Sequence, residues 1–209
     1  MKKRISSIFC LLAFAITSMQ AKDYNVKDYG AIGDGKTLDH IAINATIDTC
    51  VAHGGGRVVL PAGTYLCGSI RMKSNVELHL MTGSKILAAP ASMKAYDEAE
   101  EFEGTAYQDG GHTYFKNSLI YAIGANDVSI TGRGMIDGEG LTRRDTENGG
   151  NLHGGNIGTG DKAIAFKQCR NILIRDVTIY RGGHFGIIVT GCELGTIDNV
   201  IVDTNRDGI

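Results

Sequence analysis

The sequence lacks an excess of basic residues, a long hydrophobic run and closely spaced cysteines, and each absence excludes a class of protein. With 21 basic and 23 acidic residues among 209, the net charge of −2 provides no electrostatic basis for binding nucleic acid. The apolar run from Ile5 to Ile16 is too short to span a membrane comfortably. The 29 glycines follow no collagen period, and the length suits a single domain in which turns are frequent.

The first 21 residues have the features of a bacterial secretory signal peptide. Lys2, Lys3 and Arg4 form a basic segment, the apolar run follows, and small and polar residues end at Ala21. The alternatives are a buried N-terminal helix and, because Cys10 lies within the apolar run, a lipoprotein anchor. We therefore expect an exported protein, periplasmic or secreted, whose mature chain begins at residue 22.

Removal of this signal peptide would leave four cysteines, which an exported protein could pair as disulfides. None of them has the short spacing of a metal-binding knuckle, and each lies in an apolar stretch. Small buried core residues are therefore the favoured interpretation, and we expect neither a metal nor a cofactor. The four are Cys50, Cys67, Cys169 and Cys192.

One amphipathic helix is predicted near the start of the mature chain. Thr37 is the predicted N-cap residue, and the glycines Gly54–Gly56 end the helix. Its apolar stripe recurs every four residues, at Ile43, Ile47 and Val51.

The rest of the chain consists of short apolar runs separated by Gly, Asn and Asp, without a second long helical pattern. Such runs are typical of a β-sandwich or barrel, but an internal repeat favours a solenoid. A shift of 23 residues (192 − 169) superposes Cys169 on Cys192 and Ile174 on Ile197. Predicted strands include Arg57–Leu60, Thr64–Cys67, Val76–Leu80, Val128–Thr131, Ile164–Lys167, Ile172–Ile174, Ile187–Thr190 and Val200–Val202.

This repeat predicts an all-β fold, a right-handed parallel β-helix in which each coil stacks like residues above like. The predicted helix would cap the open N-terminal end and cover its apolar rungs. Two insertions interrupt the repeat, an acidic one near residues 91–116 and a Gly- and Asn-rich one near 139–161. Insertions in solenoids often wall a groove, and the alternative for the acidic one is a solvated loop with no task.

A competing motif lies before the helix. Residues Gly30 to Thr37 fit the phosphate-loop pattern, and Asn199–Asp203 resembles its partner strand. However, Asp34 would place negative charge where phosphates bind, and no alternation of strands and helices follows. The strand before the motif also carries charged residues, unlike the apolar central strand of a parallel sheet. We therefore do not expect nucleotide binding.

Several segments match patterns of known β-helix enzymes. Val26–Ala31 and Gly54–Tyr65 are similar to the opening and first coil of the pectate-lyase superfamily. Lys73–Leu80 and Gly132–Gly138 are similar to glycoside hydrolase family 28, the polygalacturonases. The resemblance covers nearly all of the mature chain. It implies hydrolysis, with inversion, of a pectic polysaccharide, either galacturonan or rhamnogalacturonan.

The end of the chain resembles part of this family's active site. Asn205-Arg206-Asp207-Gly208 is similar to its Asn-Thr-Asp-Gly signature, with Arg206 in the Thr position. The resemblance implies that Asp207 is one of three catalytic carboxylates. The adjacent Asp pair of the next coil is absent, although inverting hydrolysis needs an acid as well as a base. We therefore expect residues 22–209 to be the truncated N-terminal part of the domain, inactive alone.

Three further residues are candidates for substrate binding. Asn205 could position a sugar or stabilise its turn, and Arg206 could pair with a galacturonate carboxylate or remain an exposed coil residue. His184 lies 23 residues before Asp207 (207 − 184), so the repeat predicts that it stacks directly beneath it. Phe185 is the aromatic residue expected nearby.

Two other functions remain open. A polysaccharide lyase on this fold would need calcium held by clustered Asp and a strong base, and no such cluster falls on aligned coils. A β-helix that binds glycans without turnover, as adhesins and tailspikes do, is the second. At full length the protein is expected to be monomeric.

Overall fold

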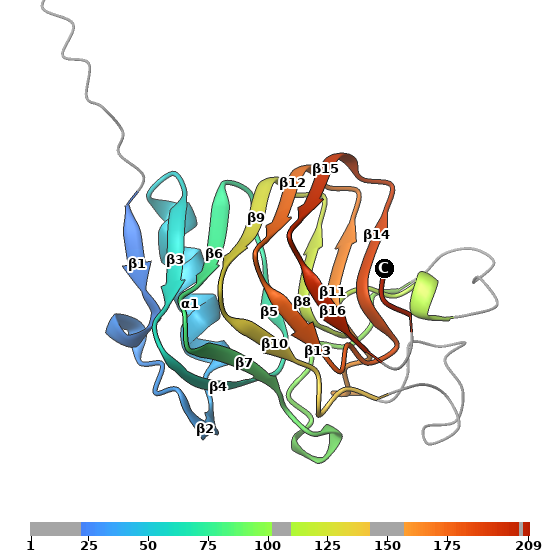
Figure 1. Ribbon diagram of the computed structural model, residues 1–209, viewed down its shortest axis with the longest axis horizontal. Coiled ribbons are helices and arrows are strands. Elements are labelled where there is room, and N and C mark those ends of the chain that lie inside the picture. Colours follow the sequence, from blue (N-terminus) through green and yellow to red (C-terminus); the bar gives the residue numbers. More distant parts are fainter. Residues whose placement is uncertain (1–21, 102–109, 143–156, 205–206) are drawn as a thin grey trace, which may run out of the picture.

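Three parallel sheets run along the molecule and form a parallel β-helix (Figure 1). The computed structural model describes residues 22–101, 110–142, 157–204 and 207–209. Sheet A consists of β1 (Asp23–Asn25), β3 (Gly56–Leu60), β6 (Val76–Leu80), β9 (Asn126–Gly132), β12 (Arg170–Arg175) and β15 (Glu193–Asp198). Sheet B consists of β2 (Asp34–Leu38), β4 (Gly63–Cys67), β7 (Ser84–Ala88), β10 (Met135–Asp137), β13 (Thr178–Tyr180) and β16 (Ile201–Asp203). Sheet C consists of β5 (Ile70–Arg71), β8 (Ser118–Ile123), β11 (Lys162–Lys167) and β14 (Phe185–Thr190).

The strand register confirms the predicted repeat of 23 residues in the last coils. Ile174 of β12 pairs with Ile197 of β15, and Ile164 of β11 pairs with Ile187 of β14. Paired residues on parallel strands face the same side of a sheet, so these ladders line the interior. A sandwich or barrel is excluded, because every strand instead pairs with its counterpart on the neighbouring coil.

The recurring Asn or Asp before the apolar runs is a requirement of the backbone. Asn75, Asp127 and Asn171 lie at the start of sheet A on successive coils, with φ of 63°, 56° and 54°. The left-handed region is strained for most side chains, but Asn and Asp tolerate it because they hydrogen-bond locally. Asn171 also donates to the Asp127 carboxylate at 2.5 Å, which joins two coils.

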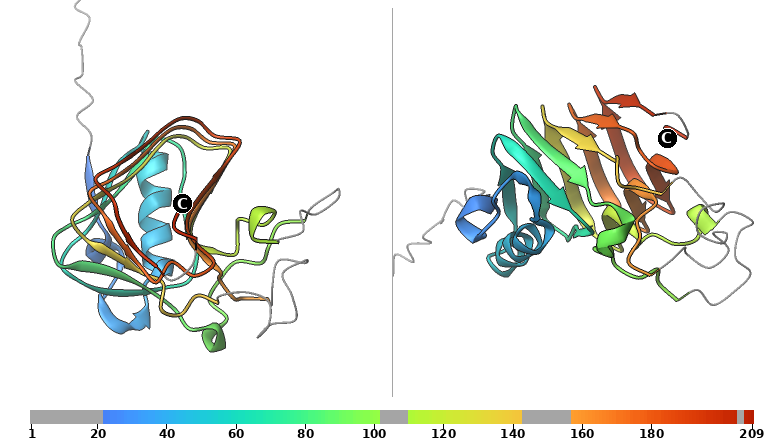
Figure 2. Two further views of the ribbon diagram at one scale, coloured as in Figure 1. Left: turned by 45° about the vertical axis from the view of Figure 1, so that its right-hand side comes forward. Right: turned by 90° about the horizontal axis from the view of Figure 1, so that it is seen from below.

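The predicted helix is present as α1 (His40–Ala52) and covers the N-terminal end of the solenoid (Figure 2). Two details differ from the prediction. Thr37 lies in β2 rather than at the N-cap position, which Asp39 occupies. Val51 is 37% exposed, and the buried stripe is Ile43, Thr46, Ile47 and Cys50. In the described residues, no helix is long and apolar enough to cross a membrane.

The turn that resembles a phosphate loop is closed by the protein's own carboxylates. Asp39 accepts hydrogen bonds from the amides of Ile32 and Gly33, at 2.7 and 3.0 Å. Asp34 accepts from the amides of Lys36 and Thr37, each at 2.8 Å. These bonds also lower the pKa of Asp34. The amides that would cradle a phosphate are therefore already occupied, and the helix begins only after a strand.

The four cysteines of the described chain are free thiols, as the core interpretation predicts. Cys169 and Cys192 stack on neighbouring coils, where the Cys169 amide donates to the Cys192 sulfur at 3.4 Å. Burial raises the pKa of the Cys67 thiol well above its usual value. These thiols therefore act as small core side chains.

Candidate functional site

Asp207 lies on the outer side of the molecule where the chain re-enters sheet C. Its backbone forms a parallel bridge with Phe185, the first residue of β14. The Gly186 amide donates to the Asp207 carbonyl at 2.9 Å, and the Ile187 amide donates to that of Gly208 at 2.9 Å. The side chain is exposed. Backbone pairing with the preceding coil thus presents this carboxylate to solvent.

The predicted stacking of His184 beneath Asp207 is wrong by one residue. The connection from Asp203 to Asp207 is one residue shorter than the equivalent connection from Tyr180 to Phe185, since Tyr180 pairs with Asp203. The register therefore slips, and Phe185 becomes the partner of Asp207.

His184 is fully buried, so in this structure it lies beneath the surface rather than facing a ligand. Its ring stacks on that of Phe185 with centroids 4.4 Å apart, and its amide donates to the Asp161 carbonyl at 2.7 Å. Gly111 packs so closely that a Cβ there would lie 2.7 Å from the His184 ring. His184 therefore supports Phe185 from below. Asn205 and Arg206 lie outside the described residues.

A small apolar cluster is buried beside Asp207. Tyr121, Ala165 and Ile188 occupy one row on the outer side of sheet C, on successive coils. Phe185 joins them, and Phe115 from the acidic insertion covers them. This cluster is separate from the main core inside the solenoid.

A buried ion pair lies on the coil before Phe185. Lys162 pairs in register with Phe185, and its ammonium contacts the Asp161 carboxylate. The two side chains are 0% and 5% exposed, respectively. Buried charges are costly unless they are paired, so the neighbouring Asp161 carboxylate compensates the buried charge of Lys162. The sequence reasoning missed it, although two adjacent opposite charges that lead into the apolar β11 were a visible signal.

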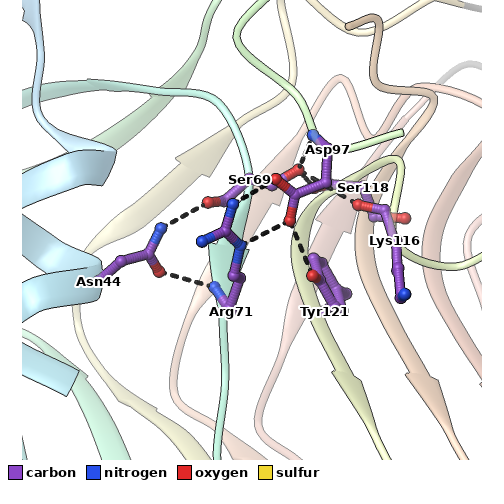
Figure 3. Close-up of polar contacts among 7 residues, drawn as sticks. All are labelled: Asn44, Ser69, Arg71, Asp97, Lys116, Ser118 and Tyr121. Atoms are coloured by element: carbon purple, nitrogen blue, oxygen red, sulfur yellow. Dashed lines mark hydrogen bonds and ion pairs between the residues drawn. The ribbon is translucent and has the colours of Figure 1, made fainter. Parts of the chain in front are cut away.

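The acidic insertion is fastened to the sheet through Asp97 (Figure 3). Arg71 of β5 donates two hydrogen bonds to its carboxylate, at 2.7 and 2.6 Å. The Tyr121 hydroxyl of β8 donates a third at 2.7 Å. The Asp97 amide donates to the Ser69 hydroxyl at 3.0 Å. Burial alone would raise the pKa of Asp97, but the hydrogen bonds and charge of Arg71 outweigh it and lower the pKa.

This anchor extends to the capping helix and to the start of β8. The Asn44 side chain of α1 donates to the Ser69 carbonyl at 2.9 Å and accepts from the Arg71 amide at 2.8 Å. The Ser69 hydroxyl donates to the Ser118 carbonyl at 2.8 Å (Figure 3). One continuous network thus joins the helix, the first coil and the insertion.

Glu100 forms a second anchor further along the insertion. Its carboxylate accepts from the amides of Phe115 and Lys116 at 2.9 and 3.0 Å, and it lies 3.6 Å from the Lys167 ammonium. Lys167 also lies over the Phe115 ring, 5.3 Å from its centroid. Asp97 and Glu100 thus fasten the insertion to Arg71 and Lys167 of the solenoid, so it is not solvated throughout. That it walls a groove stays a prediction.

The anchored insertion brings His112 to the surface beside Asp207. His112 ends a short 3-10 helix, η3 (Gly110–His112), and its side chain is exposed. Its ring meets the Phe185 ring edge-on, with centroids 4.9 Å apart. Since Phe185 is the bridge partner of Asp207, His112 lies at the edge of the same surface. The sequence analysis did not single it out.

The site as described combines the exposed Asp207 carboxylate, the exposed His112 of the anchored insertion and a buried apolar cluster that supports both. A carboxylate in this position can orient or activate a water molecule against a bound sugar ring. In the ranges that the structure describes, no group of three or more His, Cys, Asp or Glu side chains is placed to hold a metal ion.

Comparison with known proteins agrees with this architecture. The family model described as rhamnogalacturonase A/epimerase, pectate lyase-like, matches residues 24–209. The chain is 33% identical over 134 residues to the exo-poly-alpha-D-galacturonosidase of Dickeya chrysanthemi, a match that covers 61% of this chain and 21% of that protein. The structure of a hyperthermoactive exopolygalacturonase from Thermotoga maritima superposes with a TM-score of 0.71 and 25% identity, over 91% of this chain and 50% of that one.

A relative of another kind also matches. The chain is 30% identical over 184 residues to plasmin and fibronectin-binding protein A of Streptococcus pneumoniae, covering 87% of this chain and 23% of that protein. The chain therefore spans about a fifth of the length of these two curated relatives.

Proposed function

Because the chain belongs to the rhamnogalacturonase A/epimerase, pectate-lyase-like family, we propose that it is the N-terminal part of a β-helix glycoside hydrolase that degrades pectic polysaccharides. The observation that carries the proposal is the exposed Asp207 carboxylate, held on the outer side of sheet C next to the anchored insertion. The likeness to two exo-acting galacturonan hydrolases supports the substrate class, galacturonan or rhamnogalacturonan.

In the proposed mechanism Asp207 acts on the base side of an inverting hydrolysis. Its carboxylate holds the water molecule that attacks the anomeric carbon. The bridge to Phe185 fixes the backbone of Asp207 against the preceding coil. Arg206 pairs with a uronate carboxylate of the substrate, and Asn205 positions a sugar hydroxyl. His184 keeps Phe185 in place.

The general acid is the part of this mechanism that the chain does not supply. Inverting enzymes separate the two carboxyl groups by about 6.5–9.5 Å, which leaves room for the water molecule. The backbones of adjacent coils lie about 4.8 Å apart, so carboxyl groups on a following coil could diverge from Asp207 to the separation that inversion needs. We therefore propose that this chain alone does not hydrolyse pectic polymers.

The substrate also favours export. A pectic polymer is too large to enter a cell intact, so its hydrolase must act outside the cytoplasm. The basic and apolar pattern of residues 1–21 supports a signal peptide, and the protein would be periplasmic or secreted and monomeric at full length.

The test is release of reducing ends from polygalacturonate and from rhamnogalacturonan. The longer protein that includes the following coils should release them from one of the two polymers, whereas the purified 209-residue chain should not. Clear release by this chain alone would contradict the proposed division of roles. Unsaturated products from the longer protein would indicate a lyase instead.

A second candidate function is a β-helix that binds a partner without turnover. The match to plasmin and fibronectin-binding protein A favours it, because it covers more of this chain than the match to the galacturonosidase. The longer protein would then bind a ligand and release no reducing ends.

A further inference from the structure

A second surface on the other side of the solenoid has the composition of a binding site. A groove of about 580 Å³ crosses the outer side of sheet A on three successive coils, where β6, β9 and β12 turn toward sheet B. Its volume lies within the range of sites that hold small ligands. Its lining includes Glu77, His79, Thr82, Ser129, Thr131, Arg133, Leu173, Arg175 and Asp176.

Both acidic side chains of this groove accept hydrogen bonds from the protein, and Glu77 is also paired with a cation. Glu77 accepts from the Arg57 guanidinium at 3.0 Å and from the Thr131 hydroxyl at 2.5 Å, and His79 lies 3.3 Å away. Burial would raise the pKa of Glu77, but these partners lower it. The Asp176 carboxylate accepts from the Asn199 side chain at 2.7 Å. The charge of Glu77 is therefore compensated, whereas Asp176 keeps its negative charge next to Arg175 in the chain.

The two arginine side chains of this groove have few partners among the described residues. Arg133 is exposed, and no ion pair or hydrogen bond joins its side chain to the described residues. Arg175 pairs with Asp198 at 3.0 Å at the far edge of the sheet, and its side chain remains 45% exposed. Two guanidinium groups on adjacent coils thus reach solvent at one end of the groove, and guanidinium binds carboxylate with two parallel hydrogen bonds.

The remaining lining suits a sugar ring. The Ser129 hydroxyl of β9 can exchange hydrogen bonds with a polyol, and the Thr131 hydroxyl, whose proton goes to Glu77, can accept one. Leu173, in register with Ser129 on the next coil, offers an aliphatic surface to the C–H face of a ring. Because the coils repeat every ~4.8 Å, an oligosaccharide that runs along the axis meets the hydroxyl of Ser129 and the aliphatic side chain of Leu173 on adjacent coils.

We propose that this groove is a binding site for a carboxylated oligosaccharide, separate from the surface around Asp207. Arg133 and Arg175 bind a uronate carboxylate, Ser129 and Thr131 bind ring hydroxyls, and Leu173 supports the ring. The site would hold an acidic polymer on a different face of the solenoid from sheet C, whatever reaction occurs there. The proposal does not depend on the proposed function.

The test is a titration of the ¹⁵N-labelled chain with trigalacturonate, followed by NMR. Amide shifts are expected at residues 77–82, 129–133 and 173–176. Arg133→Ala with Arg175→Ala should weaken this binding about tenfold or more, as the loss of charge-assisted hydrogen bonds implies. The matched control, Lys73→Ala with Arg170→Ala, removes the same charge outside the groove and should change the affinity by less than about twofold.

Three outcomes would overturn the proposal. One is the absence of shifts at sheet A, including the case in which shifts occur only at residues 110–117, 184–188 and 207–209. The second is equal binding of a neutral trisaccharide such as maltotriose. The third is an equal loss of affinity in the two double variants. Failure of the proposed hydrolase function would instead appear as absence of reducing ends, with the sheet A shifts unchanged.

Discussion

The outer sides of sheet C and sheet A differ in what covers them, although the same coils build both. Sheet C carries an apolar row that Phe115 covers, and the acidic insertion is anchored there through Asp97 and Glu100. Sheet A carries rows of polar and charged side chains, such as Arg175 with Asp198, that remain open to solvent. The acidic insertion covers part of the outer side of sheet C, whereas the outer side of sheet A is exposed to solvent.

The difference follows from the connections between sheets. From β3 onward, each connection from sheet A to sheet B, or from sheet C to sheet A, is a short turn. Both insertions fall between sheet B and sheet C, between β7 and β8 and between β10 and β11. Asp207 also follows a connection of this kind. The solenoid can thus vary the edge between sheets B and C without disturbing its core. A groove specific to a substrate can form at this edge.

The largest effect is expected from removal of the cover of sheet C. Phe115→Ala deletes a fully buried ring and should lower the free energy of unfolding by about 3–5 kcal/mol, or release the insertion locally. Leu173→Ala on the uncovered side of sheet A is the matched control and should cost less than about 1 kcal/mol. Urea unfolding and limited proteolysis of residues 94–117 measure both. Equal effects would remove the distinction between the two sides.

The loss of a polar contact should likewise cost more stability at sheet C than at sheet A. Asp97→Asn removes the charge from a carboxylate that is 20% exposed and accepts three hydrogen bonds, and should cost about 1–2 kcal/mol. Asp198→Asn breaks an ion pair whose side chains are 45% and 56% exposed, and should cost less than about 0.5 kcal/mol. Thermal unfolding at neutral pH compares them, and a larger loss for Asp198→Asn would contradict the account.

The Asp97 anchor also predicts a dependence on pH. Its pKa is lower in the folded than in the unfolded state, so its contribution is fully present above the unfolded value of about 3.9 and is lost as the pH falls through the folded value. The difference in melting temperature between the wild type and Asp97→Asn should therefore shrink below about pH 4. A difference that stays constant from pH 6 to pH 3 would show that the charge of Asp97 is irrelevant.

The smallest effect concerns the turn that resembles a phosphate loop. Lys36→Ala should change the stability by less than about 0.5 kcal/mol, because Lys36 contributes its amide and not its ammonium to the turn. Magnesium and ATP should leave the melting temperature of the wild type unchanged. A nucleotide-dependent rise that Lys36→Ala abolishes would revive nucleotide binding.

Much of the solenoid could be predicted because its signal is local. Val76–Leu80 forms a strand with the predicted bounds, and the register of 23 residues holds where no insertion intervenes. Short strands such as Ile70–Arg71 and Met135–Asp137 escaped prediction, because two or three residues carry no periodicity of their own. Their place is set by pairing with neighbouring coils.

The candidate site was less predictable for a related reason. Asp207 was identified from a short motif, but its partner depends on the length of one connection, and a change of one residue replaced His184 by Phe185. The contact of His112 with Phe185 depends on the path of a whole insertion. The contacts that hold this insertion join residues such as Arg71 and Asp97, which no repeat relates.

The catalytic role of Asp207 is tested most directly by comparing the turnover of a pectic substrate by the longer protein and by its Asp207→Asn variant. We predict that the substitution lowers kcat by about 10²- to 10⁴-fold, the range for loss of general acid–base catalysis. The fold and the affinity for trigalacturonate should be preserved. An Asp207→Asn variant that retains the wild-type kcat would contradict the assignment of this carboxylate to the reaction.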